Sequence, residues 1–408
     1  MKRKHIIYLC ALVYFASYFS RKNFAILMSD LLQKNIIDKS TGGLICLALF
    51  ICYGIGQVFS GYLGDKLKPK HMISIGLITT ALCNLSMILT STPIILIIIW
   101  GINGLAQAML WPPIVKILST NLDNENYVKA NLIVTSAAHI STILLYIYIP
   151  ICILYFSWQF VFISSSILAL ITCIIFLIGI NSIINKNTIK DEDIIINNSS
   201  APLKTIFNQV PLIVIFLIIV AMGCLRDGIE TWLPTLYQEA FNRESSESIL
   251  VSIILPIFSI LSITLTTSLH KKSKFINNEI LGCSICFTIT TIFSTIILLI
   301  INSNNNVARY ISLALSALVC ATMHGCNFLL ISCLPGRFKL LGRSATVSGF
   351  CNAFTYVGAA ISTYGFAILS ENYGWSFIIT SWIVISIIGL ILSLATKKKY
   401  TYFISNNN

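Results

Sequence analysis

Two apolar stretches, SRKNFAILMSDLL from Ser20 to Leu32 and LRDGIETWLPTLY from Leu225 to Tyr237, each carry an arginine. An offset of 205 residues superimposes Arg21 on Arg226. A guanidinium in the hydrocarbon core of a bilayer costs at least roughly 3 kcal/mol, so such residues usually have a function. The group keeps its charge at any accessible pH, and its forked donors match a phosphate or a carboxylate. Two arginines at matching positions therefore predict a binding site for a dianion.

The composition is that of a membrane protein. Hydrophobic residues make up 56% of the 408 residues and charged residues 10%, whereas globular domains carry about 25% charged residues. This excludes a soluble enzyme, and we find no metal-ligand, nucleotide or cofactor pattern. A spanning helix needs about 20 mostly apolar residues. Such stretches lie at 6–29, 42–64, 71–90, 93–118, 128–154, 158–182, 208–234, 248–269, 279–301, 307–333, 343–369 and 374–395.

The distribution of the positive charges predicts the topology. Of the 27 lysines and arginines, 20 fall in segments that are cytoplasmic if the N-terminus is inside, and four fall in outside loops. This bias favours a multi-pass protein of the inner or plasma membrane with both termini in the cytoplasm. The net charge of +12 therefore calls for no nucleic-acid partner, because the cations face lipid headgroups. The first span is too long for the core of a signal peptide, so we expect no cleaved leader.

A polar stretch divides the chain into two halves of six spans each. We expect an N-terminal six-helix bundle at 1–182, a cytoplasmic linker at 183–206 and a C-terminal six-helix bundle at 207–408. This all-α plan of 12 transmembrane helices resembles the major facilitator superfamily, which implies a substrate site between the halves. The loop that begins Gly61-Tyr-Leu-Gly-Asp65-Lys66 is similar to a loop motif of that superfamily.

Polar side chains on the first and seventh spans are candidates for the site. Tyr14, Tyr18 and Arg21 have the spacing i, i+4, i+7 and share one helix face. They favour binding of an oxyanion, although tyrosines also occur as interfacial anchors. Glu230 lies one turn after Arg226 and is expected to neutralise it partly, or to form a structural ion pair with it. Lys22 points away from Arg21.

Four further interpretations concern residues whose faces the sequence leaves less certain. Lys22 is expected to pair with Asp227 or Glu230 as a structural or gating contact. Histidines within apolar spans, His139 and His324, are either ligands or packing residues. A proline pair after Trp111 predicts a kink in the fourth span. Asn327, Tyr356 and Tyr364 are further candidates for lining the second half.

Ionisable groups other than the arginines are scarce in the spans. Asp227 and Glu230 are the two carboxylates expected at depth, and both adjoin Arg226. Proton-coupled carriers usually need an intramembrane carboxylate that titrates, so this pattern favours exchange of one anion for another. The 13 cysteines show no ligand spacing with histidine, and packing is their expected role.

The stretch YFASYFSRKNFAILMSDLL, which begins at Tyr14, resembles the first span of the organophosphate:phosphate antiporters. The stretch from Arg226 resembles their seventh span, and the Trp111-Pro-Pro and Ala-Ala-His139 steps are also similar. The resemblance implies that Arg21 and Arg226 bind the phosphoryl group of the substrate. It implies that Tyr14 and Tyr18 line the same site and that His139 contributes to phosphate binding or coupling. Gln57 occupies the position at which the glycerol-phosphate members have lysine.

These observations predict a carrier that exchanges a phosphorylated small organic molecule, such as a sugar phosphate, for inorganic phosphate. The expected partners are that anion, phosphate and the bilayer, and we expect a monomer without a cofactor. One alternative is a membrane sensor that binds a hexose phosphate without transporting it. Another is a carrier of a carboxylate or a drug, because two arginines also suit a dicarboxylate. Competition by phosphate against bound substrate distinguishes these readings.

Overall fold

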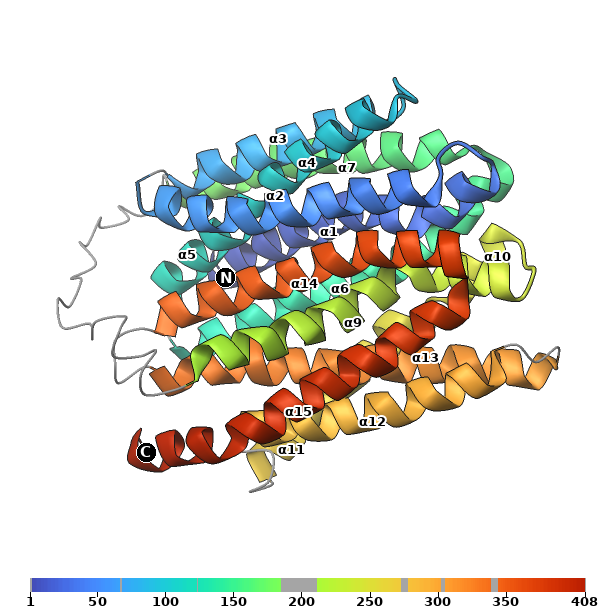
Figure 1. Ribbon diagram of the computed structural model, residues 1–408. Coiled ribbons are helices and arrows are strands. Elements are labelled where there is room, and N and C mark those ends of the chain that lie inside the picture. The colour runs from blue at the N-terminus through green and yellow to red at the C-terminus, as the bar shows by residue number, and fades with distance from the viewer. Residues whose placement is uncertain are drawn as a thin grey trace. The chain divides into compact units, whose positions relative to one another are not determined.

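The computed structural model describes residues 2–66, 68–122, 124–184, 211–272, 278–301, 305–338 and 344–407 (Figure 1). Within these ranges every regular element is a helix. Ten of the described stretches are long and apolar enough to cross a membrane. Two further helices, α1 (Lys2–Gln33) and α3 (Pro69–Ser86), complete the twelve predicted spans. The prediction of an all-α protein with twelve spans is confirmed.

The chain divides into two compact units. The first unit contains residues 1–194 together with 244–253. Its six spans are α1, α2 (Lys39–Lys66), α3, the α4–α5 pair (Pro93–Ala108 and Trp111–Asn121), α6 (Asn124–Tyr155) and α7 (Trp158–Ile184). The short helix α10 (Ser245–Val251) also belongs to this unit, although it comes from the second half of the sequence.

The second unit contains residues 195–243 and 254–408. Its described helices are α9 (Leu212–Ala240), α11 (Ile254–Lys272), α12 (Glu279–Ile300), α13 (Asn306–Asn327), α14 (Ser344–Tyr373) and α15 (Trp375–Asn407). A π-helical turn, η1 (Phe328–Cys333), and a 3₁₀ turn, η2 (Leu334–Phe338), continue α13. The predicted linker, 183–206, lies outside the described residues except at its first two positions.

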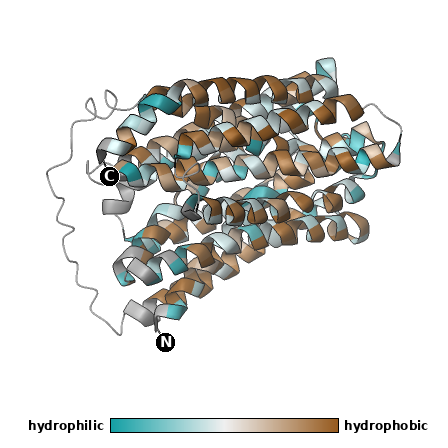
Figure 2. Cartoon of the chain, turned by 90° about the horizontal axis from the view of Figure 1, so that it is seen from below, coloured by the Kyte–Doolittle hydropathy of each residue, from teal (hydrophilic) through white to brown (hydrophobic). Residues whose placement is uncertain are grey.

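The exposed faces of the helices are apolar, as contact with lipid requires. In α7, the exposed residues Ile167, Ile171, Ile174 and Ile178 recur at helical spacing along one stripe. Figure 2 shows hydrophobic colouring along most of the length of the helices. Where water is absent, a helix satisfies its own backbone groups, so apolar sequences of this length form helices rather than open strands.

Buried polar side chains fix the position of α1 within the first unit. The Asn23 amide donates to Asn84 of α3 at 2.7 Å and to Ser165 of α7 at 2.9 Å. The Asn84 amide in turn donates to the Ser20 carbonyl at 3.0 Å, and Ser17 bonds to Gln107 of α4. Satisfied buried networks of this kind specify one arrangement of neighbouring helices.

Close backbone approach fixes α9 against α14 in the second unit. A Cβ atom on Gly358 would lie 2.3 Å from the Val220 carbonyl oxygen, and one on Gly223 would lie 2.4 Å from that of Thr355. The Cys224 thiol donates to the Gly358 carbonyl oxygen at 3.2 Å. Small residues allow such contact between membrane helices. This packing holds the helix that carries Arg226.

The structure corrects the count of buried carboxylates. Besides Asp227, it buries Asp30 near the end of α1 and Glu279 at the start of α12, each 1% exposed. Asp30 accepts from the Ser245 hydroxyl of α10 at 2.9 Å and forms an ion pair with Lys34. Glu279 binds Arg337 and Tyr400. Their positions near helix ends hid both acids from a count of residues at the middle of spans.

The proline pair interrupts the fourth span, as predicted. α4 ends at Ala108, and α5 begins at Trp111 with Pro112 and Pro113 in its first turn. Proline is tolerated in a first turn because the N–H that it lacks would have no partner within the helix. The break lets the Trp111 ring lie 4.8 Å from the Tyr14 ring, centroid to centroid.

Candidate functional site

Arg21 lies among aromatic rings in the first unit. Its guanidinium carbon is 4.4 Å from the centroid of the Tyr18 ring and 4.8 Å from that of Tyr53 on α2. The Tyr14 and Tyr18 rings are 5.0 Å apart in an edge-to-face arrangement. The predicted shared face of Tyr14, Tyr18 and Arg21 is therefore present. Aromatic faces attract a guanidinium without cancelling its positive charge.

Gln57 follows Tyr53 by one turn on α2, so both residues lie on the same helix face. Its side-chain amide nitrogen is buried and has no hydrogen-bond partner in the described part of the chain. A buried donor without a partner costs about 1–3 kcal/mol. This orphaned donor, one helical turn from the residue whose ring contacts Arg21, is suited to donate to an anionic oxygen.

His139 lies half-buried in α6, which packs along α1. Two residues later, the Ser141 hydroxyl donates to the Phe15 carbonyl oxygen at 2.9 Å and ties the two helices together. The structure thus places His139 in the same unit as Arg21. Its role in phosphate binding remains a prediction.

Arg226 lies among polar groups in the second unit. Its guanidinium donates to the side-chain oxygen Oδ1 of Asn327 on α13 at 2.7 Å and to the Asp227 carboxylate at 2.6 Å. The Tyr356 hydroxyl of α14 is close enough to interact with it electrostatically. The structure therefore brings Arg226, Asn327 and Tyr356 together from three helices.

Glu230 lies close enough to Arg226 to offset part of its charge, as expected from their spacing, but its hydrogen bond is with another residue. A hydrogen bond of 2.7 Å joins a carboxylate oxygen of Glu230 to Nε2 of His324. The long Arg226 side chain pairs instead with its sequence neighbour Asp227. The i, i+4 spacing thus brings Glu230 near Arg226, while His324 approaches Glu230 from α13. The predicted pairing of Lys22 with Asp227 or Glu230 stays a prediction, and within its own unit Lys22 lies near Cys46.

Other predicted features carry less information. The side chains of the loop residues Gly61, Asp65 and Lys66 lie outside the described part of the structure. All 13 cysteines lie within the described part of the structure, and none forms a disulfide.

Two residues of the candidate site, Tyr53 and Cys320, were not predicted from the sequence. Each precedes a named candidate, Gln57 and His324 respectively, by four residues, and this spacing was the available signal.

Comparisons with known proteins match this architecture. The family model described as Major Facilitator Superfamily matches residues 10–363. The D-xylose-proton symporter superimposes with a TM-score of 0.73 at 10% identity and covers 96% of each chain. A bacterial homologue of the human lysosomal transporter Spinster, inward-facing and occupied, gives 0.71 at 10% identity, over 99% of this chain and 96% of that one. At such low identity these structures show the fold alone.

Relatives with known names match part of the chain. A probable hexose phosphate transport protein of Chlamydia trachomatis serovar D is 38% identical over 117 residues, 29% of this chain and 26% of that protein. The glycerol-3-phosphate transporter of Bacillus subtilis is 34% identical over 104 residues, 24% and 23% of the two chains. Membrane sensor protein UhpC of Escherichia coli K12 is 26% identical over 117 residues, 29% and 27% of the two chains. The matched region spans about a quarter of each relative, and it confirms the resemblance inferred from the motifs.

Proposed function

Because the chain belongs to the major facilitator superfamily, we propose that this membrane transporter exchanges a phosphorylated small organic molecule for inorganic phosphate. Sugar phosphates are the substrate class that we favour. The proposal includes alternating access and a topology with both termini in the cytoplasm. It draws support from the named relatives, among them a probable hexose phosphate transport protein and a glycerol-3-phosphate transporter.

The environment of Arg21 is the observation that carries the proposal. Two tyrosine rings hold its guanidinium, and a buried amide donor of Gln57 without a partner lies one turn from one of these rings. A dianion would receive forked hydrogen bonds from Arg21 and satisfy the orphaned donor. Phosphate monoesters and inorganic phosphate share the group that this arrangement suits.

Arg226 supplies the second positive group in the proposal. Asp227 offsets its charge, while Asn327 orients the guanidinium. An ion pair of this kind holds a buried arginine at lower cost than an isolated charge. We propose that Arg226, like Arg21, binds the phosphoryl group of the substrate.

A membrane sensor is the second candidate, because UhpC carries that name and is similar over the same fraction of the chain. A carrier of dicarboxylates is the third, since a pair of arginines also binds two carboxylates. The three candidates differ in flux and in the competitor that each recognises.

Exchange of labelled phosphate in reconstituted proteoliposomes tests the proposal. We expect uptake only into vesicles preloaded with phosphate, and we expect hexose phosphates or glycerol-3-phosphate to compete with it. Binding of a hexose phosphate without any exchange would favour the sensor. Competition by dicarboxylates, but not by phosphate esters, would favour the carboxylate carrier.

A further inference from the structure

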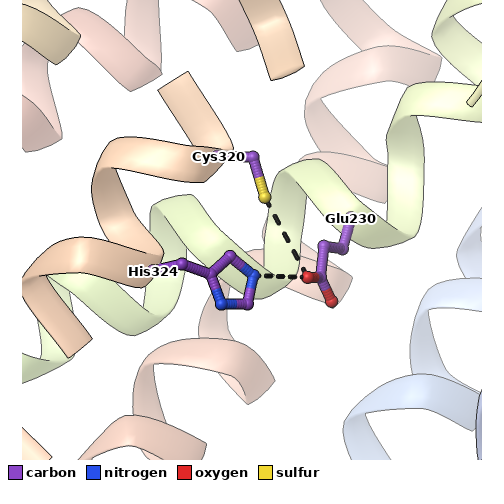
Figure 3. A group of neighbouring side chains, drawn as sticks. All are labelled: Glu230, Cys320 and His324. Atoms are coloured by element: carbon purple, nitrogen blue, oxygen red, sulfur yellow. Dashed lines mark hydrogen bonds and ion pairs between the residues drawn. The ribbon is translucent and has the colours of Figure 1, made fainter. Parts of the chain in front are cut away.

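Glu230, Cys320 and His324 bring three different donor atoms together within the second unit (Figure 3). Cys320 and His324 lie one turn apart on α13 and project from the same face, while Glu230 approaches from α9. Their donor atoms all lie within 4.8 Å of one another. The imidazole Nε2 is 2.7 Å from a Glu230 oxygen, and the Cys320 sulfur is 4.0 Å from the same oxygen.

This geometry is close to that of a tetrahedral metal site. Zinc bonds of about 2.0–2.3 Å place neighbouring ligand atoms roughly 3.3–3.7 Å apart. The imidazole and the carboxylate would separate slightly, and the thiol would move inward. Two ligands at i and i+4 on one helix are also the arrangement of the histidines in helical zinc motifs.

The chemistry of the donors selects a class of ion. Calcium and magnesium prefer oxygen ligands, whereas a thiolate and an imidazole favour zinc, cobalt or copper. A thiolate and a carboxylate together neutralise a divalent cation. The adjacent Arg226 is already paired with Asp227, so the nearby positive charge is offset. The Glu230 side chain is 19% exposed and that of His324 11%, so the site is within reach of solvent.

We propose that Glu230, Cys320 and His324 bind a divalent transition-metal ion such as zinc, with a fourth position left to water or an anion. Binding would release the Cys320 proton and join α9 to α13. The expectation that no cysteine has ligand spacing with a histidine is wrong for Cys320 and His324, which lie four residues apart. Glu230 lies 90 residues before Cys320, and only the fold brings it to them. A metal bridge beside Arg226 would inhibit transport, and this consequence rests on the proposed function.

Titration with cobalt(II) tests the site without any transport assay. In detergent and phosphate-free buffer, we expect thiolate-to-cobalt charge-transfer absorption in the near ultraviolet, and we expect zinc to abolish it. Cys320→Ser should remove this absorption and weaken binding by at least about 100-fold, since loss of an outer-shell contact alone costs 10- to 100-fold. Cys351→Ser, which alters a buried thiol on α14, is the matched control and should bind like the unaltered protein.

Absence of the charge-transfer absorption from the folded protein would overturn the proposal. Equal absorption in the Cys320→Ser and Cys351→Ser variants would also overturn it. Phosphate exchange then supplies a second readout, in which micromolar zinc should inhibit the Cys351→Ser control but not Cys320→Ser. Cobalt binding without any phosphate exchange would leave the metal site intact and would contradict the proposed function instead.

Discussion

Arg21 is buried and Arg226 is partly buried, and their surroundings differ. Aromatic rings surround Arg21, whereas an acid and an amide hold Arg226. Rings hold the guanidinium in place and leave its positive charge to act on a ligand. We therefore expect Arg21 to dominate recognition of the anion and Arg226 to depend on the polar groups around it.

Arg21→Lys is the residue-scale test. Lysine keeps the charge but loses the fork, and each charge-assisted hydrogen bond contributes about 1.5–3 kcal/mol. We expect phosphate exchange to fall by roughly 10- to 100-fold for each bond lost, with unchanged expression and melting temperature. Arg309→Lys is the control, because that arginine also lies over an aromatic ring, Phe241, at 5.6 Å. Normal exchange by Arg21→Lys would contradict the assignment of Arg21.

Residue spacing predicted part of the site. The period of the helix placed Tyr14, Tyr18 and Arg21 on one face, and the structure has them there. Spacing placed Glu230 near Arg226 but did not predict its hydrogen bond with His324, which comes from a helix about 90 residues away. The spacing of Tyr53 one turn before Gln57 was a signal, but its contact with Arg21 depends on how α1 and α2 pack.

At the scale of elements, the contact between α9 and α14 positions Arg226. Gly358→Ala would place a methyl group against the Val220 carbonyl oxygen, so the helices would have to separate. We expect a loss of about 1–3 kcal/mol in stability, measured as a lower melting temperature in detergent. Gly365→Ala on the same helix is the control, because its Cβ would meet no described atom within 4 Å. Equal effects of the two substitutions would contradict this packing.

Asp38 stabilises the start of α2, the helix that carries Tyr53 and Gln57. Its carboxylate accepts from the Thr41 backbone N–H at 2.6 Å. Hydrogen bonds from the Thr41 side chain and then from this N–H lower the pKa of Asp38 below its ordinary value of 3.8. A lowered folded-state pKa adds stability that is fully present above the ordinary value and is lost as the pH falls through the folded value. We expect Asp38→Ala to cost about 1 kcal/mol at neutral pH and less in acid.

The matched variant for this cap is Asp38→Asn, because asparagine caps helices about as well as aspartate but does not titrate. Its melting temperature should stay near that of the unaltered protein at neutral pH. Stability that falls equally in Asp38→Ala and Asp38→Asn would show that the charge, rather than the cap, stabilises α2.

Element boundaries were predictable where proline or hydropathy marks them. The pair after Trp111 predicted the break between α4 and α5. The return of α10 to the first unit was not predicted, since it rests on contacts such as Ser245 with Asp30, 215 residues away. Such long-range polar contacts leave no periodic signal in the sequence.

At the scale of the whole molecule, each unit carries one of the two matching arginines on its first described helix, α1 or α9. The offset of 205 residues that relates these arginines predicted this arrangement. In the proposed carrier, each unit contributes a positive group that recognises the phosphoryl group. Such a carrier exchanges anions rather than letting them leak.

Hetero-exchange tests this central claim most directly. Proteoliposomes loaded with labelled phosphate would be mixed with an external hexose phosphate, and release of the label would be followed over time. The account predicts rapid release that depends on the added hexose phosphate and is slow when the external solution contains no exchangeable anion. Release at the same rate with and without an external substrate, or no release from folded protein, would contradict the account.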